Sequence, residues 1–453
     1  MVSVISKPFS SIDIPRLCRW VFAVHLLPLA VLIVKTAPWM TGDSRRYIAL
    51  SESLARGHGF GLGDNATYEP AVFEPEGWRL PGYPLFIAAS RFVAGGNDWG
   101  IVLIQSALFL ASVWLVYKTA VRVFGALTGL IFLVFSAAYP FVAYSAGQIS
   151  PEAPVIFLVS LAFFLLSDPT TWRVALAAFL IGLSAYFRPN LLLLNFALAA
   201  ALVLMSRHNY RKALLMALIA VILAFPWAAR NYWLFGKFTP GPVIKGSGTV
   251  LLLATWQSRV SIPSLVEYGM NGNFTSEAKS SGMIDQVSSL NRQLGVPENT
   301  LFVSPEAYPG NQAKLKADEL FADTAIANIK NYPLAYLKSC LINSLRMWFS
   351  AYFPERIPAV IRYGLLAEGV LVLVMGLGGI FVTMREGDQL QKPALILFIM
   401  MFLYFSATLC WLHTEARYTI PVRLLLLLFA AQFASKLVGK LMKRVQIYLT
   451  NNG

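Results

Sequence analysis

The stretch Thr41-Gly42-Asp43-Ser44-Arg45-Arg46-Tyr47 is the first strongly polar segment after the first apolar run of the chain. It places one carboxylate beside two arginines, at the point where that apolar run has just ended. The residues from Ser44 to Arg56 have the composition of a short helix, and an Asp directly before a helix is a favoured N-cap. Almost everything downstream is either an apolar segment or a loop able to return to this point, so the chain is organised around it.

The composition defines the environment of the protein. Of its 453 residues, 57% are hydrophobic and 13% are charged, with a mean hydropathy of +0.60. Soluble domains carry about 25% charged residues, and several windows approach the roughly 20 apolar residues that cross a bilayer. The sequence therefore predicts an integral, multi-pass membrane protein.

The net charge of +14 follows from Lys and Arg residues that flank the apolar segments, where they orient spans and meet anionic lipid. No basic run interleaved with aromatic residues is present, so we expect membrane lipid and no nucleic acid as a partner. Cys18, Cys340 and Cys410 are scattered, and their spacing indicates neither a disulfide framework nor a metal site.

Hydropathy and the positive-inside bias predict about ten spans. Lys7, Arg16 and Arg19 precede the first apolar run, and no small-residue cleavage site follows it, so we expect an uncleaved first span with its N-terminus inside. The predicted spans cover 20–38, 101–117, 124–139, 153–166, 174–187, 191–205, a seventh ending at 225–227, and then 363–382, 393–411 and 421–438.

The apolar stretch 334–353 has two interpretations. As a span it would invert every later loop and put the basic tail at 440–444 outside. As an interfacial helix it leaves that tail inside, and its Lys338, Arg346 and aromatic residues suit an interface. We predict an interfacial helix.

The long segment before that stretch changes composition. Residues 259–310 are rich in Ser, Gly, Asn and Pro, without an apolar period long enough for a span. Residues 314–330 then show an amphipathic pattern, with Phe321, Ala325 and Ile329 four apart on one helix face.

With this topology, the charged residues separate by side of the membrane. The inner turns are short and mostly basic, whereas the acids gather with cations at the outer ends of spans, so we expect the function to face outward. The outer set is Asp43, Arg45, Arg46, Arg79, Glu152, Arg188, Arg230, Lys237, His413, Glu415 and Arg417.

A series of motifs along the chain resembles the GT-C glycosyltransferases, the multispan enzymes that take a sugar from a polyprenyl-phosphate carrier. Each motif alone is weak, but their order extends over nearly the whole chain. They are Gly42-Asp43-Ser44-x-x-Tyr47, Gly57-x-Gly59-Phe60, Arg79-Leu80-Pro81-Gly82-Tyr83-Pro84, Gln148-x-x-x-Glu152, Arg188-Pro189, Pro226-Trp227-x-x-Arg230-Asn231-Tyr232, Asn331-Tyr332-Pro333 and Glu415-x-Arg417-Tyr418-x-x-Pro421.

The resemblance, which extends to protein O-mannosyltransferases and lipid A aminoarabinose transferases, implies an architecture. We expect an all-α polytopic bundle of about ten transmembrane helices with interfacial helices and extracytoplasmic loops. Residues 1–228 would form a seven-span catalytic module that includes outer loop 39–100. Residues 229–335 would form an extracytoplasmic loop region, and 336–453 the interfacial helix with three C-terminal spans.

The resemblance also implies an activity. The donor would be a polyprenyl-phosphate sugar and the acceptor a hydroxyl of an envelope glycan, lipid or protein. Transfer would be inverting, at the extracytoplasmic face of a bacterial inner membrane.

Asp43 occupies the position of the proposed catalytic base in that family. A positioned carboxylate that takes the proton of an acceptor hydroxyl contributes about 10²–10⁴-fold, whereas the alternative role as an N-cap is worth about 1 kcal/mol. Glu152 stands at the outer mouth of the fourth span, where an acid suits either a site, orienting the acceptor or assisting a metal, or a helix start. Glu69, Glu74 and Glu76 are predicted to be solvated loop charges.

The cations have a task if the donor is a phosphate diester, because Arg offers permanently charged planar donors to phosphate oxygens. Arg188, Arg230 and Arg417 are the first candidates and Lys237 a weaker one, with interfacial snorkelling as the alternative for each. Arg79 could contact substrate or pair with an acid to hold the loop. The other expected substrate contacts are Arg45, Arg46, Tyr47, His58, Tyr83, Gln148 and Glu415.

Cofactor and class remain open from the sequence alone. His58 and His413 could ligate a divalent metal with nearby acids or merely form hydrogen bonds, so a metal is possible and none is certain. An oligosaccharide polymerase or ligase that uses a diphosphate-linked glycan would need the same groups. A lipid or glycolipid transporter would expect charges near mid-membrane and broken helices in two halves, and a membrane scaffold would not depend on Asp43.

Overall fold

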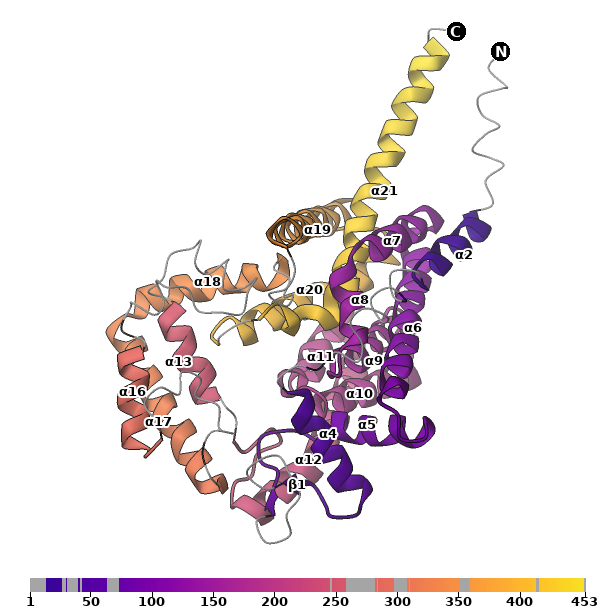
Figure 1. Ribbon diagram of the computed structural model, residues 1–453. Coiled ribbons are helices and arrows are strands. Elements are labelled where there is room, and N and C mark those ends of the chain that lie inside the picture. Colours follow the sequence, from indigo (N-terminus) through magenta and orange to yellow (C-terminus); the bar gives the residue numbers. More distant parts are fainter. Residues whose placement is uncertain are drawn as a thin grey trace.

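The computed structural model describes residues 14–26, 30, 40, 43–62, 73–244, 247–257, 282, 284–296, 308, 310–349, 358–412 and 415–451. Within them the chain is almost entirely helical (Figure 1). Most of the first predicted span, 20–38, lies outside the described residues, which include the helix α2 (Ile14–Val24) at its start.

The first half of the chain alternates apolar helices with short turns. Its elements are α4 (Ser44–Ala55), β1 (Gly61–Leu62), β2 (Glu74–Pro75), α5 (Gly82–Val93), α6 (Asp98–Phe124), α7 (Ala126–Ala138), α8 (Pro140–Gly147), α9 (Glu152–Leu166), α10 (Thr171–Ala185), the 3₁₀ turn η2 (Pro189–Leu191), α11 (Leu194–Met205), η3 (Arg207–Asn209) and α12 (Tyr210–Phe235). The strands β1 and β2 form a two-stranded antiparallel hairpin that pairs Gly61 with Pro75. This hairpin lies in the first outer loop, directly before the Arg79 motif.

The second half begins with polar helices and ends with long apolar ones. Its elements are α13 (Ser247–Gln257), α16 (Ile284–Gln293), α17 (Gly310–Asn331), α18 (Pro333–Phe349), α19 (Ala359–Glu386), α20 (Gln391–Leu409), η6 (Ala416–Thr419) and α21 (Ile420–Asn451). The helix predicted over 314–330 is confirmed as α17, with Phe321 and Ala325 buried.

Several helices are long and apolar enough to cross a membrane, which confirms an integral membrane protein. Among the described residues they are Asp98–Phe124, Arg207–Phe235, Val360–Glu386, Gln391–Leu409 and Ala416–Tyr448. A sixth span is possible if α7 and α8 count as one, although they bend by 59° where Pro140 cannot continue the hydrogen-bond ladder. α9, α10 and α11 are apolar but shorter. The count of about ten spans therefore stays a prediction.

The stretch predicted to be interfacial forms α18, a helix of 17 residues. It is not among the helices that qualify as spans by length and composition.

α21 supplies the centre of the main core. Its residues from Leu424 to Ala431 are almost completely buried, and α7, α9 and α19 pack around it. Two glycines of α19 allow a close approach: a Cβ at Gly379 would lie 1.9 Å from the Phe429 carbonyl oxygen, and one at Gly376 would lie 2.3 Å from Leu426. Small residues at such contacts let helix backbones meet within membranes.

A second, smaller core joins α13, α16 and α17 outside the main bundle, around Trp256, Leu290 and Phe321. Figure 1 shows these helices beside the bundle, reached through α18. α17 also contacts the β-hairpin, since the Asn311 amide donates to Glu74 and its side chain donates to the Pro75 carbonyl at 2.9 Å. α17, and with it this second core, is thereby attached to the segment between α4 and α5.

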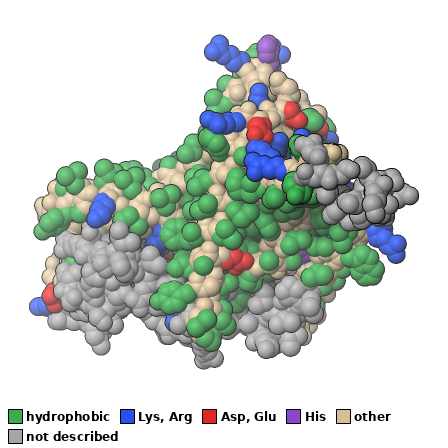
Figure 2. Space-filling model, turned by 90° about the horizontal axis from the view of Figure 1, so that it is seen from above, with side chains coloured by type: hydrophobic (Ala, Val, Ile, Leu, Met, Phe, Trp, Pro, Cys, Tyr) green, Lys and Arg blue, Asp and Glu red, His purple; other side chains and the backbone are tan. Residues whose placement is uncertain are grey.

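The two ends of the molecule differ. α2 and the C-terminal end of α21 lie at one end, while α4 and the β-hairpin lie at the other (Figure 1). Figure 2 shows hydrophobic side chains over much of the visible face, and residues such as Phe92, Trp233 and Leu334 are more than 80% exposed. Such an apolar exterior is what a lipid-facing surface requires.

We expect Gly379→Ala to destabilise the protein, because the added methyl group would separate α19 from α21; overpacking of this kind costs about 1–3 kcal/mol. The matched control is Gly364→Ala in the same helix, where an added Cβ meets nothing within 4 Å. Thermal unfolding in detergent should show a lower Tm for Gly379→Ala alone. Equal Tm values for both variants would contradict the close packing.

Candidate active site

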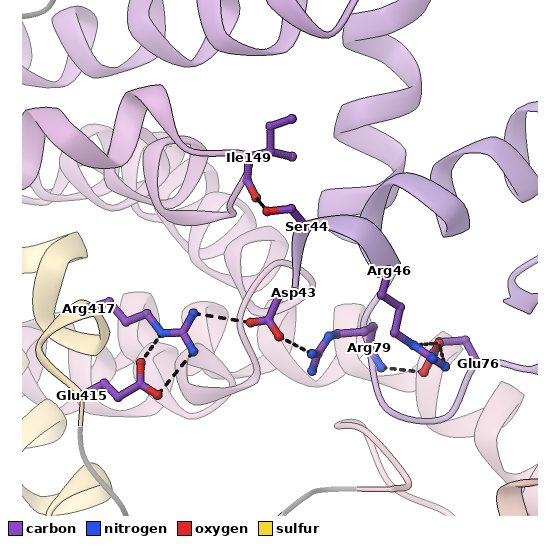
Figure 3. Close-up of polar contacts among 8 residues, drawn as sticks. All are labelled: Asp43, Ser44, Arg46, Glu76, Arg79, Ile149, Glu415 and Arg417. Carbon is purple, nitrogen blue, oxygen red and sulfur yellow. Dashed lines mark hydrogen bonds and ion pairs between the residues drawn. The ribbon is translucent and has the colours of Figure 1, made fainter. Parts of the chain in front are cut away.

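The carboxylate of Asp43 does not cap the helix that follows it. Asp43 is the N-cap residue of α4, but its side chain makes no capping hydrogen bond. Instead Oδ1 accepts from Arg79 Nη2 at 2.6 Å and Oδ2 accepts from Arg417 Nη1 at 3.4 Å (Figure 3). Asp43 therefore occupies the N-cap position, as the sequence predicts, but its carboxylate bonds two arginines from distant loops and does not cap the helix.

The start of α4 is fixed by the next residue. Ser44 is buried, and its hydroxyl donates to the Ile149 carbonyl at 2.8 Å. This bond attaches Asp43 to the segment that leads into α9 and Glu152 (Figure 3).

A buried acid that the sequence analysis missed holds Arg79 in place. Glu76 is 2% exposed and satisfies both of its oxygens. Oε1 accepts from the backbone amides of Trp78 and Arg79 at 2.6 and 2.9 Å, and Oε2 accepts from Arg46 Nε and Nη2 at 2.9 and 2.7 Å. The prediction that Glu76 is a solvated loop charge is wrong, because the loop folds around it and four donors compensate its burial.

The other two predicted loop charges differ from Glu76. Glu74 is partly exposed, and it also contacts Lys314 Nζ at 3.8 Å. Glu69 lies outside the described residues.

Arg417 lies between two acids. Its Nε is 2.5 Å from Glu415 Oε2, and its Nη1 reaches Asp43 (Figure 3). Arg417 lies in η6 and Glu415 is the N-cap residue of η6, so both lie directly before α21. The ion pair of Arg417 with Asp43 therefore links the C-terminal part of the chain to the start of α4.

A second ion pair adjoins this group. Arg188, at the tip between α10 and η2, donates through Nη2 to Glu152 Oε1 at the start of α9. Arg188 is 9% exposed and Glu152 1%, and the guanidinium lies 5.8 Å from the Tyr418 ring. Within the described part of the chain, Arg188 Nε and Glu152 Oε2 have no hydrogen-bond partner. Both are buried polar atoms whose hydrogen-bonding capacity the described residues leave unused.

The electrostatics of Asp43 follow from these neighbours. Burial acts to raise its pKa, but the charges of Arg79, Arg417 and Arg188 together outweigh burial and bring the pKa to about 2. Asp43 is therefore ionised at neutral pH. The three arginines balance the three carboxylates of Asp43, Glu152 and Glu415.

Aromatic and amide side chains pack next to these ion pairs. Tyr47 packs edge-on against Tyr83 at 5.0 Å and lies under the Arg79 guanidinium at 5.5 Å. Tyr83 is completely buried and donates to Gln105 Oε1, and Gln105 in turn donates to the Gln148 carbonyl at 2.7 Å. Tyr83 thus packs next to the site residues. Gln105 belongs to the same hydrogen-bond network, and no sequence motif indicated it.

Other predicted residues lie apart from Asp43. Arg230 stacks on Trp227 at 4.4 Å and donates to the Phe60 carbonyl, and its role as a donor contact stays a prediction. Arg230 lies on α12 and contacts Phe60, the residue directly before β1.

The remaining predicted contacts are peripheral. Lys237 is exposed and pairs with Glu319 at 3.0 Å, Arg45 is exposed on α4, and His58 lies in the turn after α4 with its amide bonded to the Ser53 carbonyl. None of these three contacts Asp43 among the interactions of the described residues.

The described residues contain no group of three or more His, Cys, Asp or Glu side chains that could hold a metal ion. His413, one of the two histidines considered for a metal, lies outside the described residues.

Comparison with solved structures gives the class of the fold. The chain matches the archaeal oligosaccharyltransferase AglB from Archaeoglobus fulgidus, in complex with an inhibitory peptide and a dolichol-phosphate, with a TM-score of 0.54 and 12% identity. The match covers 96% of this chain and 52% of AglB, so the chain spans about half the length of that enzyme. The fold is that of the membrane GT-C glycosyltransferases, as the motifs indicate.

The sequence gives a family match for part of the chain. Residues 75–230 match the family described as dolichyl-phosphate-mannose-protein mannosyltransferase. This segment begins beside Glu76 and ends at Arg230, so it contains Arg79, Glu152 and Arg188. This match covers 156 of the 453 residues, and over that segment it supports the resemblance to GT-C enzymes.

Two crystal structures of ArnT from Cupriavidus metallidurans also match. The apo state has 15% identity and covers 86% of this chain and 76% of ArnT, and the form bound to undecaprenyl phosphate has 13% identity and covers 89% and 77%. Both have a TM-score of 0.40, at which the likeness carries no argument. No curated protein matches the chain.

We expect Glu76→Gln to destabilise the first outer loop strongly. The change removes the carboxylate that pairs with the buried Arg46 guanidinium at 2.7 Å, and breaking one side of a buried ion pair costs about 3–5 kcal/mol. The control is Glu52→Gln on α4, whose side chain is 47% exposed in its pair with Arg91, where surface pairs contribute about 0–1 kcal/mol. Limited proteolysis of the loop and thermal unfolding would measure both; equal stability of the two variants would contradict the role of Glu76.

Proposed function

We propose that this protein is a glycosyltransferase that moves a sugar from a polyprenyl-phosphate-linked donor to a hydroxyl of an envelope glycan, lipid or protein. The observation that carries the proposal is the carboxylate of Asp43, which bonds Arg79 and Arg417 from opposite parts of the chain beside a buried Arg188–Glu152 pair. A general base next to several guanidinium groups suits transfer away from a phosphate. The GT-C fold and the family match support this reading.

The chemistry divides between the acid and the arginines. The acceptor oxygen forms a bond to the sugar C1 while the bond from C1 to the phosphate oxygen breaks, and the hydroxyl proton passes to Asp43. The phosphate leaves with the bonding electrons, and Arg188 and Arg417 stabilise its charge. Attack opposite the leaving phosphate inverts the anomeric configuration.

Glu152 has a supporting role in this scheme. It is bonded to Arg188, and its second oxygen lacks a partner among the described residues. Glu152 would hold the Arg188 fork toward the donor and present the free oxygen to an acceptor hydroxyl. Running the transfer assay below with and without a chelator tests whether the reaction uses a divalent metal.

The distribution of charge supports a proposal for the side of the membrane that the site faces. Asp43 directly precedes α4, and α4 lies at the end of the molecule opposite the C-terminal end of α21 (Figure 1). The C-terminal end of α21 carries Lys436, Lys440, Lys443 and Arg444. Basic segments favour the cytoplasmic side, so we place the site at the extracytoplasmic face of a bacterial inner membrane. The outer helices α13, α16 and α17 would then contact the acceptor.

We expect Asp43→Asn to lower transfer by about 10²–10⁴-fold, the contribution of a positioned general base. The assay offers purified protein a panel of radiolabelled polyprenyl-phosphate and polyprenyl-diphosphate sugars with membrane extract. Asp98→Asn, a surface acid at the start of α6 that pairs with Arg91, is the matched control and should keep full activity.

Three outcomes of this assay would contradict the proposal. Equal transfer by Asp43→Asn and wild type would remove Asp43 from the mechanism. Transfer from diphosphate-linked donors alone would favour a polymerase or ligase. Absence of transfer from every donor would favour a transporter or a scaffold.

The pH dependence should reflect the arginines around Asp43. Because the pKa of Asp43 is lowered to about 2, the ionised form and its ion pairs persist above its ordinary pKa and are lost only as the pH falls toward 2. We expect kcat/KM to show no acidic loss from Asp43 between pH 8 and 5. Arg79→Gln should move such a loss to higher pH, since burial then acts with less opposition. The control Arg91→Gln, which removes a guanidinium that pairs with Glu52 and Asp98, should not. An unchanged profile for Arg79→Gln would contradict this account.

A further inference from the structure

Arg423 is a buried cation that the proposed chemistry does not use. It lies on the first turn of α21 and has no exposed surface. Its guanidinium donates from Nε to Thr419 Oγ1 at 3.1 Å, from Nη1 to the Tyr139 hydroxyl, and from Nη2 to the Met347 carbonyl at 2.7 Å. A further contact joins Nη2 to the Ala416 carbonyl at 3.5 Å.

These acceptors belong to three segments that are far apart in the sequence. Thr419 and Ala416 are in η6, Met347 is in the last turns of α18, and Tyr139 is at the bend between α7 and α8. The guanidinium also lies 4.5 Å from the Phe141 ring at the start of α8. One side chain therefore joins η6, α18 and α8.

Two of these segments lead to opposite sides of the candidate site. η6 carries Arg417, with Glu415 directly before it. α8 leads through Ile149, whose carbonyl accepts from Ser44 beside Asp43, and on to Glu152. Arg423 thus connects the segment that carries Arg417 with the segment that leads to the Ser44 contact beside Asp43.

The chemistry of arginine explains the choice of residue. A guanidinium within an apolar bundle is costly unless its donors are satisfied, and here the fork reaches acceptors on all three segments at once. Lysine has a compact ammonium group without this planar fork, so it could keep the charge but not all three connections. Thr419 alone would still bond the Met347 carbonyl at 2.7 Å, so η6 would be held at fewer points.

We propose that Arg423 is a positioning residue that sets the separation of Asp43 and Arg417, and with it the subsite for the donor phosphate. The inference rests on the proposed function. The contact at risk is the longer of the two that Asp43 makes, at 3.4 Å to Arg417 against 2.6 Å to Arg79. A small shift of η6 would break it and leave the Arg79 contact intact.

The first test is a double-mutant cycle of Arg423→Met with Arg417→Gln, read as kcat and KM for the radiolabelled donor. A displacement of about 1 Å can cost about 100-fold in rate, so we expect Arg423→Met to lower kcat/KM by about that factor. In the Arg417→Gln background the same change should have little further effect, since residues that act through one another are non-additive. Arg423→Lys should recover part of the loss.

Asn195→Ala is the control for damage that is only structural. Asn195 is buried in α11 and donates to the Ala178 carbonyl of α10 at 3.0 Å. Its effect should be the same in both backgrounds. A full loss from Arg423→Met that persists in Arg417→Gln would overturn the proposal.

A second measurement does not depend on activity and so separates this inference from the proposed function. Spin labels at Glu52→Cys on α4 and Trp411→Cys before η6, with the three native cysteines changed to Ser, report the distance between the two sides of the site. Arg423→Met should shift or broaden that distance distribution, whereas Asn195→Ala should not. An unchanged distribution in Arg423→Met would refute the positioning role, even if the enzyme is inactive on every donor.

Discussion

The contact on which the site depends joins Asp43 to Arg417, two residues separated by 374 positions in the chain. A carboxylate at the start of α4 would ordinarily bond the free amides of its own helix. Here two guanidinium groups occupy its oxygens, and each is carried by a loop that must return to the same end of the bundle. The fold can therefore be understood as the arrangement that brings these loops together.

Buried charges perform that task on both sides. Glu76 accepts hydrogen bonds from the backbone of the Arg79 loop and pairs with Arg46. Arg423 donates hydrogen bonds to η6, α18 and the α7–α8 bend. Both are costly to bury and are stable only because each meets several partners. Neither contacts the proposed reacting atoms, and each determines where a residue of the site lies.

This arrangement also explains how Asp43 could act as the proposed general base although several cations surround it. The arginines keep Asp43 ionised, and the same groups offer permanent charge to a leaving phosphate. The unused polar atoms of Arg188 and Glu152 lie alongside. The three acids and three arginines together carry no net charge. The protein therefore buries no uncompensated charge at this site before an anionic donor binds.

The sequence by itself determined the membrane class, the α4 and α17 helices, the GT-C resemblance and the gathering of Asp43, Glu152, Arg188 and Arg417 at one side. Those features follow from local composition, periodicity and motif order, which are written along the chain. Only the tertiary structure decided that Glu76 is buried, that Arg230 stacks apart on Trp227 and that Arg423 joins three segments. Solvation and pairing of a charge depend on which distant loops fold over it, and no local pattern records that.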